Sequence, residues 1–325
     1  MTTKEMAERI FSGDKKTLAK AMTLICSHLD NDKEIAKRLL PIILEKSTPA
    51  YRIGISGIGG VGKSTFIEAL GSSILESDPS IKLGVLTIDP SSPNSGGSIL
   101  ADSVRMNNLV SSDRVFLRAA SNNTQLGGLN REAYELVTLL EGAGCHYIMI
   151  ETVGSGQSDD RINLLSDLSI LLQMPASGDS MQALKKGSIE NADLLVIHKN
   201  DGLLKKEASK ASLLYKQRGQ LLHSTSGHKE TPVFLVSSIE KTGLKELWRM
   251  IEKIQKKQIK EHLLEHKRNS QRKELFEDQV VAEFRELLKN SKTLSKEKKQ
   301  LEKLLDEKKT SPLLAARSLL MNLHL

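Results

Sequence analysis

The chain has 325 residues, enough for one large α/β domain with helical additions or for two domains. Hydrophobic residues make up 39% and charged residues 27%, an ordinary globular composition, and no apolar stretch approaches the roughly 18 residues of a membrane span. The net charge of +7 is concentrated in residues 253–310, which hold 17 Lys and Arg against 11 Asp and Glu. These numbers exclude a membrane-spanning protein and leave the main domain close to neutral.

The first residues and the cysteines bear on the compartment. Acidic residues stand in MTTKEMAERIFSGDKK where a signal peptide would have an apolar segment. Two cysteines, Cys26 and Cys145, are too few for a disulfide framework or a four-thiolate metal site. We therefore expect a cytoplasmic protein.

Residues 1–50 have apolar residues at helical spacing without strand-like runs, which predicts an N-terminal helical extension of two or three helices. From Tyr51 onward, β-rich runs alternate with helical segments; the runs are YRIGIS, KLGVLTID, RVFLR, CHYIMIE, LSILLQM, DLLVIHK and PVFLVS. This alternation predicts an α/β fold with a mostly parallel central sheet over residues 51–258.

The strongest motif is GIGGVGKS, Gly57 to Ser64, between the strand YRIGIS and the helical TFIEALGSSIL. Its glycines let backbone N–H groups turn inward around phosphates, Lys63 can reach the terminal phosphates, and Ser64 can bind Mg²⁺. The motif in this context predicts a P-loop NTPase.

The nucleotide base is indicated by His198, Lys199, Asn200 and Asp201, which follow the strand DLLVIHK where a GTPase has Asn-Lys-x-Asp. A carboxylate at Asp201 can accept hydrogen bonds from guanine N1–H and the 2-amino group, whereas adenine N1 is an acceptor. This favours GTP and GDP. His198 replaces the usual Asn, and we expect this change to remove a side-chain amide that ties the base loop to the phosphate loop.

The segment ETVGSGQS, Glu151 to Ser158, resembles the Asp-x-x-Gly switch of GTPases with Glu in place of Asp. Gly154 would then donate its N–H to the γ-phosphate. Asp89 and Asp102 lie near expected carboxyl ends of strands, where ligands collect in open α/β sheets and where they can hold Mg²⁺. Many GTPases place the Gln that lies near the attacking water directly after this Gly, whereas Gln157 lies three residues beyond Gly154. We therefore expect slow intrinsic hydrolysis.

Residues 259–325 mix charges of both signs with apolar residues at helical spacing, which predicts amphipathic helices with a solvated charged face. Their apolar stripes need a partner surface, so we expect a helical dimerisation arm and a homodimer. The tail does not interleave aromatic residues with Arg as a nucleic-acid stacking surface would, so we expect no nucleic acid as a partner. The stripes are Phe276, Val280, Phe284, Leu287 and Leu288; Leu294, Leu301, Leu304 and Leu305; Leu313, Leu314, Leu319 and Leu320.

Four blocks together carry a family resemblance: IDPSSPNSGGSILADSVRM, SNNTQLGGLNREAYE, ETVGSGQS and MPASGDSMQALKKGSIENADLLVIHKNDG. They resemble the methylmalonyl-CoA mutase-associated GTPases of the MeaB type, formerly called arginine-transport ATPases or kinases. The resemblance implies a G domain with an N-terminal helical extension and a C-terminal dimerisation arm. It also implies a GTPase that loads, protects or reactivates an adenosylcobalamin-dependent acyl-CoA mutase, with GTP hydrolysis as the timer.

The same resemblance assigns the site. Asp89, Asp102, Glu151 and Ser64 would hold Mg²⁺. Lys63, Glu151, Gln157, Gln182 and Lys185 would be catalytic, the last two within an extra switch loop, residues 178–187, that responds to the mutase. The nucleotide would contact Gly57, Gly59, Gly60, Val61, Gly62, Lys63, Ser64, Thr65, Gly154, His198, Lys199, Asp201, Ser237, Ser238 and Ile239.

Three residues depart from the family pattern: Gly59 replaces Pro, His198 replaces Asn, and Ser238 replaces Ala. Gly59 would loosen the phosphate loop and His198 would lose an amide, so we expect weaker nucleotide binding than is usual for the family.

Two other functions stay open. One is a nickel-insertion metallochaperone GTPase, although His262 and His266 are four residues apart on an expected exposed helix and the sequence has no metal-binding run. The other is an ATP-using, transport-associated kinase. A cobalamin-binding Asp-x-His-x-x-Gly motif is absent from the sequence, so any cobalamin chemistry would belong to the partner.

Overall fold

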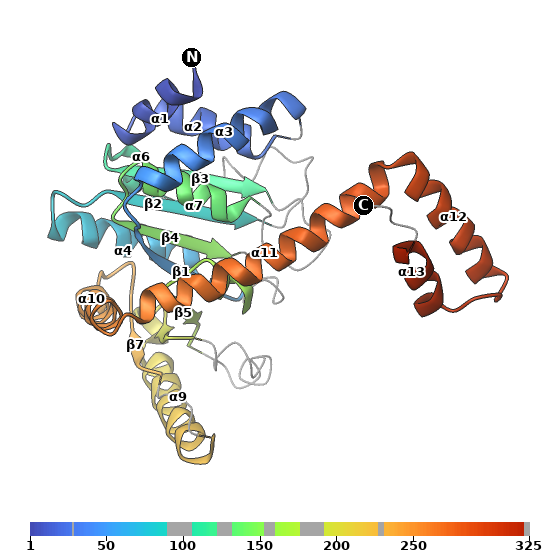
Figure 1. The fold of residues 1–325 in the computed structure, drawn as a ribbon. Helices are drawn as coiled ribbons and strands as arrows, with labels where there is room; N and C mark the ends of the chain where they lie inside the picture. The colour runs from blue at the N-terminus through green and yellow to red at the C-terminus, as the bar shows by residue number, and fades with distance from the viewer. Residues whose placement is uncertain are drawn as a thin grey trace. The chain divides into compact units, whose positions relative to one another are not determined.

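The computed structural model describes residues 1–27, 29–89, 106–121, 132–152, 160–175, 192–226 and 231–321. The chain divides into two compact units, Met1–Arg268 and Asn269–Leu325. Figure 1 traces both units in chain order. The first unit carries the central sheet and everything that positions the candidate site.

One sheet runs through the first unit. The described strands are β1 (Tyr51–Gly57), β2 (Leu83–Asp89), β3 (Val115–Ser121), β4 (Tyr147–Thr152), β5 (Leu168–Gln173), β6 (Leu194–Ile197) and β7 (Val233–Leu235). They lie in the order β3-β2-β4-β1-β5-β6-β7, and every neighbouring pair is parallel. The arrows of β1, β2 and β4 point the same way in Figure 1. All seven runs expected from the sequence form strands, which confirms the α/β fold with a P-loop.

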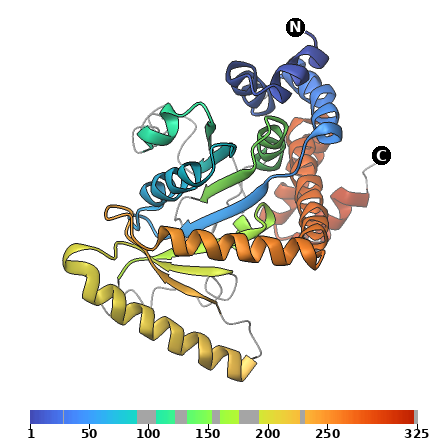
Figure 2. The same cartoon turned by 90° about the vertical axis from the view of Figure 1, so that its left-hand side faces the viewer.

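Helices cover both faces of this sheet. On one face, α4 (Lys63–Ser77) and α10 (Leu244–Lys260) share an apolar core with the sheet residues Ile53, Ile55 and Val196. On the other face lie α7 (Ala133–Gly142), the short η1 (Asp160–Leu164), and α9 (Lys205–Ser226) after η3 (Gly202–Leu204). A short helix, α6 (Asn107–Ser111), precedes β3. Figure 2 shows α9, in yellow, beside β6 and β7.

Cover on both faces explains the strand sequences. Every residue of β1, β5 and β6 is buried, and parallel strands enclosed in this way read as nearly continuous apolar runs instead of alternating ones. Parallel pairing requires a crossover connection, and the described helices α4, α7 and α9 lie in the crossovers from β1 to β2, from β3 to β4 and from β6 to β7.

Three helices precede the sheet: α1 (Thr3–Phe11), α2 (Lys15–Ile25) and α3 (Asp30–Lys46), all packed on α7 or on one another. A capping box between Thr2 and Glu5 begins α1, and the Asp14 side chain accepts a hydrogen bond at the start of α2. The expected two or three N-terminal helices are therefore three.

Two buried ion pairs lie around Ala50, directly before β1. The Arg52 guanidinium lies 2.9 Å from the Glu141 carboxylate, and that of Arg268 lies 2.5 Å from Asp167. Ala50 bonds to both pairs, since its N–H donates to Glu141 and its carbonyl accepts from Arg268. The sequence pattern predicts a solvated charged face for the helix of Arg268; this is wrong for Arg268, which is buried against Asp167.

Helix α11 (Leu263–Asn290) begins in the first unit and continues into the second, which also holds α12 (Lys292–Asp306) and α13 (Pro312–Met321). Helices α12 and α13 contact each other, and Leu294 and Ala315 are buried. Several other apolar side chains expected to form stripes are exposed in the single chain: Phe276, Val280, Leu287, Leu304, Leu313, Leu314 and Leu320.

Candidate functional site

The phosphate loop connects the end of β1 to the start of α4. Gly57, Gly60 and Gly62 have φ values of 147°, 78° and 96°, in the region that favours glycine. A Cβ at Gly57 would also lie 2.6 Å from the Leu172 carbonyl oxygen of β5. The loop therefore needs glycine at these positions, and it turns directly into the N-terminus of α4, where backbone N–H groups favour anions.

The Lys63 ammonium lies over this loop. Its Nζ donates to the carbonyls of Gly57 at 2.8 Å and Ile58 at 3.3 Å, and the side chain is largely buried. The positive charge is thereby held where the loop would surround phosphates, as its place in the motif predicts.

Ser64, in the first turn of α4, contacts Glu151 of β4. The Ser64 hydroxyl lies 3.2 Å and 3.3 Å from the two carboxylate oxygens of Glu151, and both side chains are buried. A hydroxyl and a carboxylate at the phosphate end of a P-loop are hard oxygen ligands of the kind that Mg²⁺ prefers, so these residues fit the ion. Asp89 ends the neighbouring strand β2, two residues beyond Thr87, which pairs with Glu151.

The base loop follows β6. Lys199, with φ of 58°, donates from Nζ to the Gly60 carbonyl at 2.9 Å and contacts the Met174 sulfur at 3.8 Å. The Asp201 carboxylate accepts from the Ser237 hydroxyl at 2.5 Å, and that hydroxyl accepts the Glu240 N–H at 3.0 Å. Of the two residues expected to read guanine, Lys199 is therefore held against the phosphate loop, and Asp201 is held against the loop that follows β7.

His198 corrects an expectation. Its Nδ1 lies 2.8 Å from the Val61 carbonyl oxygen of the phosphate loop, and its Nε2 lies 2.7 Å from the Ser238 hydroxyl. The expected loss of the tie between base loop and phosphate loop was wrong, because an imidazole has two nitrogens and reaches both partners. Ser238, the other departure near the base, supplies one of those partners.

Sequence reasoning missed two contacts of this cluster. Phe66 of α4 packs edge-on against the His198 ring, with ring centroids 5.9 Å apart. Met174, directly after β5, contacts Lys199. Phe66 belongs to no motif, and Met174 only begins one of the blocks that carry the family resemblance, so the fold alone brings them to this cluster. The joint departure of His198 and Ser238 from the family pattern was the one signal in the sequence.

The remaining expected site residues divide into two groups. Gly59, Thr65 and Ile239 are exposed beside the loops, and nothing lies within 4 Å of a Cβ built at Gly59. The others lie outside the described residues: Asp102, Gly154, Gln157, Gln182 and Lys185.

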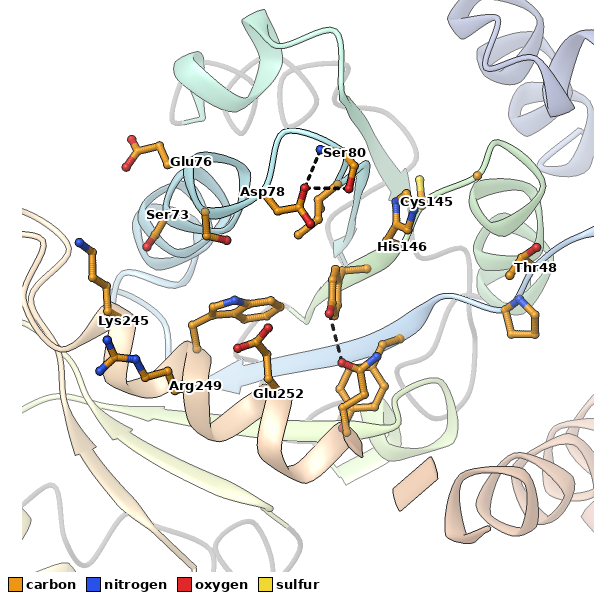
Figure 3. A pocket seen from close by; sticks show the side chains of 18 residues that line it. Thr48, Ser73, Glu76, Asp78, Ser80, Cys145, His146, Lys245, Arg249 and Glu252 are labelled. Carbon is orange, nitrogen blue, oxygen red and sulfur yellow. Dashed lines mark hydrogen bonds between the residues drawn. The ribbon is translucent and has the colours of Figure 1, made fainter. Parts of the chain in front are cut away.

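A separate hollow lies at the opposite edge of the sheet. A cavity of about 1080 Å³ opens at the amino ends of β1 and β4, with Lys245, Arg249 and Glu252 of α10 on one wall (Figure 3). Tyr51 lines it, whereas the phosphate loop begins at Gly57; six residues of strand span roughly 20 Å. The cavity is therefore no part of the nucleotide site.

Metal-binding clusters and membrane helices are both absent from the described part of the chain. There, no group of three or more His, Cys, Asp and Glu side chains is arranged to hold a metal ion. Within the same residues, no helix is both long enough and apolar enough to cross a membrane.

Comparison with known proteins identifies the family. The family described as methylmalonyl Co-A mutase-associated GTPase MeaB matches residues 18–293. GTPase ArgK of Escherichia coli K12 is 37% identical over 250 residues, which are 77% of this chain and 75% of that protein. The mouse protein named methylmalonic aciduria type A homolog, mitochondrial, is 35% identical over 290 residues, 85% of this chain and 69% of the relative.

A solved structure agrees with the sequence matches. The crystal structure of an LAO/AO transport system kinase superposes with a TM-score of 0.75 at 28% identity, covering 98% of this chain and 96% of that one. The phosphate loop, the loop after β6 with Lys199 and Asp201, and the match over most of the chain lead to one conclusion: this chain belongs to the methylmalonyl-CoA mutase-associated GTPases of the MeaB type.

Proposed function

We propose that this chain binds GTP and GDP with Mg²⁺ at the carboxyl edge of the sheet, hydrolyses GTP slowly, and serves as a chaperone of an adenosylcobalamin-dependent acyl-CoA mutase. The observation that carries the guanine part is the Asp201 carboxylate, held at 2.5 Å by Ser237 in a loop whose Lys199 reaches Gly60. A carboxylate fixed in this way can accept hydrogen bonds from guanine N1–H and the 2-amino group. Adenine N1 is itself an acceptor and offers the carboxylate no hydrogen.

The phosphate end is assigned to α4 and β4. Backbone N–H groups from Gly57 to Ser64 would bind the phosphate oxygens, and Lys63 would exchange its bonds to the Gly57 and Ile58 carbonyls for bonds to the terminal phosphates. Ser64 and Glu151 would hold Mg²⁺, together with the carboxylates of Asp89 and Asp102. When bound, the ion neutralises charge on the phosphate oxygens.

Hydrolysis and switching rest on the family resemblance. Gly154 would bind the γ-phosphate, and Gln157 would lie near the attacking water, too far from Gly154 in sequence for efficient orientation. Gln182 and Lys185 would speed hydrolysis when the partner repositions them. GTP would order the loops around residues 151–158 and 178–187, and its hydrolysis would release the partner.

The mutase partner is supported by names. The family's description associates it with methylmalonyl-CoA mutase, and several relatives are named methylmalonic aciduria type A homologs. The C-terminal unit would mediate a homodimer, because apolar side chains along its helices are exposed in the single chain.

Nucleotide competition tests the first part. A fluorescent GDP should be displaced by GTP and GDP at concentrations well below those needed for ATP. Equal competition by ATP would refute the guanine assignment and favour a transport-associated kinase.

The second part is tested by mixing the purified chain with a cobalamin-dependent mutase from the same cell. Size-exclusion chromatography with GDP, and then with a non-hydrolysable GTP analogue, should give complexes of different stability, and the mutase should raise the rate of GTP hydrolysis. Absence of co-elution in both states, with no change in hydrolysis rate, would reject the mutase role.

A further inference from the structure

The two departures from the family pattern near the base meet in space. His198 follows β6 and Ser238 follows β7, forty residues later in the chain, yet the His198 Nε2 and the Ser238 Oγ are 2.7 Å apart. Both side chains are buried, with 3% and 8% of their surface exposed. Removing one member of such a buried pair leaves the other without its hydrogen-bond partner, which is energetically costly.

The partners fix the protonation of the ring. The Val61 carbonyl can only accept, so the His198 Nδ1, 2.8 Å away, carries the hydrogen. In the neutral ring, Nε2 then accepts from the Ser238 hydroxyl. Burial, and next the positive charge of Lys199, lower the pKa of His198, so the ring stays neutral near pH 7 although the Val61 carbonyl and Asp201 oppose the shift.

Packing fixes the ring's position. The edge of Phe66 lies against it, and a Cβ at Gly62 of the phosphate loop would be 2.9 Å from its Cε1. The imidazole therefore fills the space between the phosphate loop and α4 on one side and the loop after β7 on the other.

The ring of His198 joins the loops that must be correctly positioned relative to one another for a nucleotide to bind. Val61 lies in the phosphate loop, His198 is adjacent to Lys199 in the base loop, and Ser238 is adjacent to Ser237, which holds Asp201. One side chain thus connects the three loops that would contact the phosphates and the base.

We propose that His198 and Ser238 are a matched pair of positioning residues that hold the base-reading loops against the phosphate loop and so set the affinity for guanine nucleotides. The pair replaces the Asn and Ala expected at these positions, and it rests on the proposed guanine-nucleotide function. Neither residue needs to touch the nucleotide for this role. The expectation of weak nucleotide binding does not follow once the two departures compensate each other.

A double-mutant cycle tests the pair. Ser238→Ala leaves Nε2 of a buried ring without its donor and should weaken GDP binding roughly tenfold. His198→Asn should weaken it by a similar factor, because Ser238 then loses its acceptor. The variant with both changes has the expected Asn and Ala together and should return to within about threefold of the unmodified chain.

The matched control is Ser212→Ala, since Ser212 is also a buried serine but lies on α9. It should leave GDP affinity unchanged. Thermal unfolding without nucleotide separates positioning from general damage. If the pair had a merely structural role, both single variants would be less stable and the double variant would not regain GDP affinity.

Nitrogen-15 NMR of the histidine ring gives a measurement independent of nucleotide. His198 should show the neutral tautomer with hydrogen on Nδ1, and Ser238→Ala should shift the Nε2 resonance while Ser212→Ala does not. A protonated ring or the other tautomer at pH 7.5, or single-variant losses that simply add in the double variant, would overturn the pairing. Failure of the unmodified chain to bind GDP would instead refute the proposed function.

Discussion

The Ser237 hydroxyl donates to the Asp201 carboxylate at 2.5 Å and accepts the Glu240 N–H at 3.0 Å. Ser237, in the loop that follows β7, therefore orients one oxygen of the Asp201 carboxylate. The orientation of this carboxylate does not depend on a bound nucleotide. The specificity of the site should therefore depend on Asp201 more than on any other single residue of the base loop.

Asp201→Asn should change the base preference from guanine to xanthine. The amide can donate to the oxygen at C2 of xanthine, whereas guanine loses a charge-assisted acceptor worth about 1.5–3 kcal/mol, or roughly 10–150-fold in affinity. Competition of GDP and XDP for the same fluorescent nucleotide measures this. Unchanged preference for GDP would remove Asp201 from the base site.

The base and phosphate loops show what could be derived from sequence. GIGGVGKS has local spacing that dictates its conformation, and the positive φ values of Gly60 and Gly62 are what such a loop needs. The position of Lys199 and Asp201 could also be predicted from the sequence, because the residues after a parallel strand lie at the edge of the sheet where ligands bind. These features follow from residues close together in the chain.

Long-range partners could not be derived in this way. The sequence indicates only the loss of an amide at His198, because nothing in it shows that Ser238 faces the ring; the parallel pairing of β6 with β7 brings the two together. The burial of Arg268 escapes prediction for the same reason, since its partner Asp167 lies 101 residues earlier. Periodicity reports which face of a helix is apolar, not which single charge is paired.

Glu151→Gln should separate metal binding from nucleotide binding. The Ser64 hydroxyl lies 3.2 Å from this carboxylate, and removing its charge weakens an oxygen ligand set for Mg²⁺. GTP hydrolysis should fall at least about tenfold, one order of magnitude in rate, and need more Mg²⁺, while GDP affinity measured without Mg²⁺ changes little. Glu252→Gln, at the opposite edge of the sheet, is the control, and equal hydrolysis by both variants would exclude Glu151 from the metal site.

Arg268→Ala should destabilise the first unit. Burial alone would lower the pKa of Arg268, but the hydrogen bonds and charge of Asp167 raise it above its ordinary value, so the buried guanidinium stays charged. Removing one partner of a buried pair costs about 3–5 kcal/mol because it leaves the other charge unpaired. Urea unfolding measures the loss; the exposed Arg272→Ala should lose less than about 0.5 kcal/mol, and similar midpoints for the two variants would contradict the argument.

His198 should make stability depend on pH. Its folded-state pKa is lowered, chiefly by burial, so below the ordinary value of about 6.5 the unfolded chain binds a proton that the folded chain resists. The contribution of the neutral His198 to the free energy of unfolding is therefore fully present above about pH 6.5 and decreases as the pH falls toward the folded-state pKa. The melting temperature should drop more between about pH 7.5 and 5.5 in the unmodified chain than in the doubly changed His198→Asn, Ser238→Ala variant; parallel curves would show that His198 is not held neutral.

The C-terminal unit should mediate self-association. Phe276 is 68% exposed and Leu313 60% exposed in the single chain, and a partner surface that buries each such residue contributes roughly 1.5–3 kcal/mol. The chain should be cut after Arg272, because a cut after Gln258 would also remove Arg268 and leave Asp167 buried without its partner. The shortened chain should bind GDP as the full chain does and be monomeric by light scattering.

Point variants distinguish this account from binding to nucleic acid. Phe276→Ser with Leu313→Ser should dissociate the full-length dimer, whereas Lys298→Ser with Lys299→Ser should not, because apolar burial and not charge drives the association. A nucleic-acid site makes the opposite forecast: the lysine changes would weaken RNA binding that falls steeply with salt, and the apolar changes would not. A dimer that survives both the cut after Arg272 and the apolar substitutions would place the interface elsewhere in the chain.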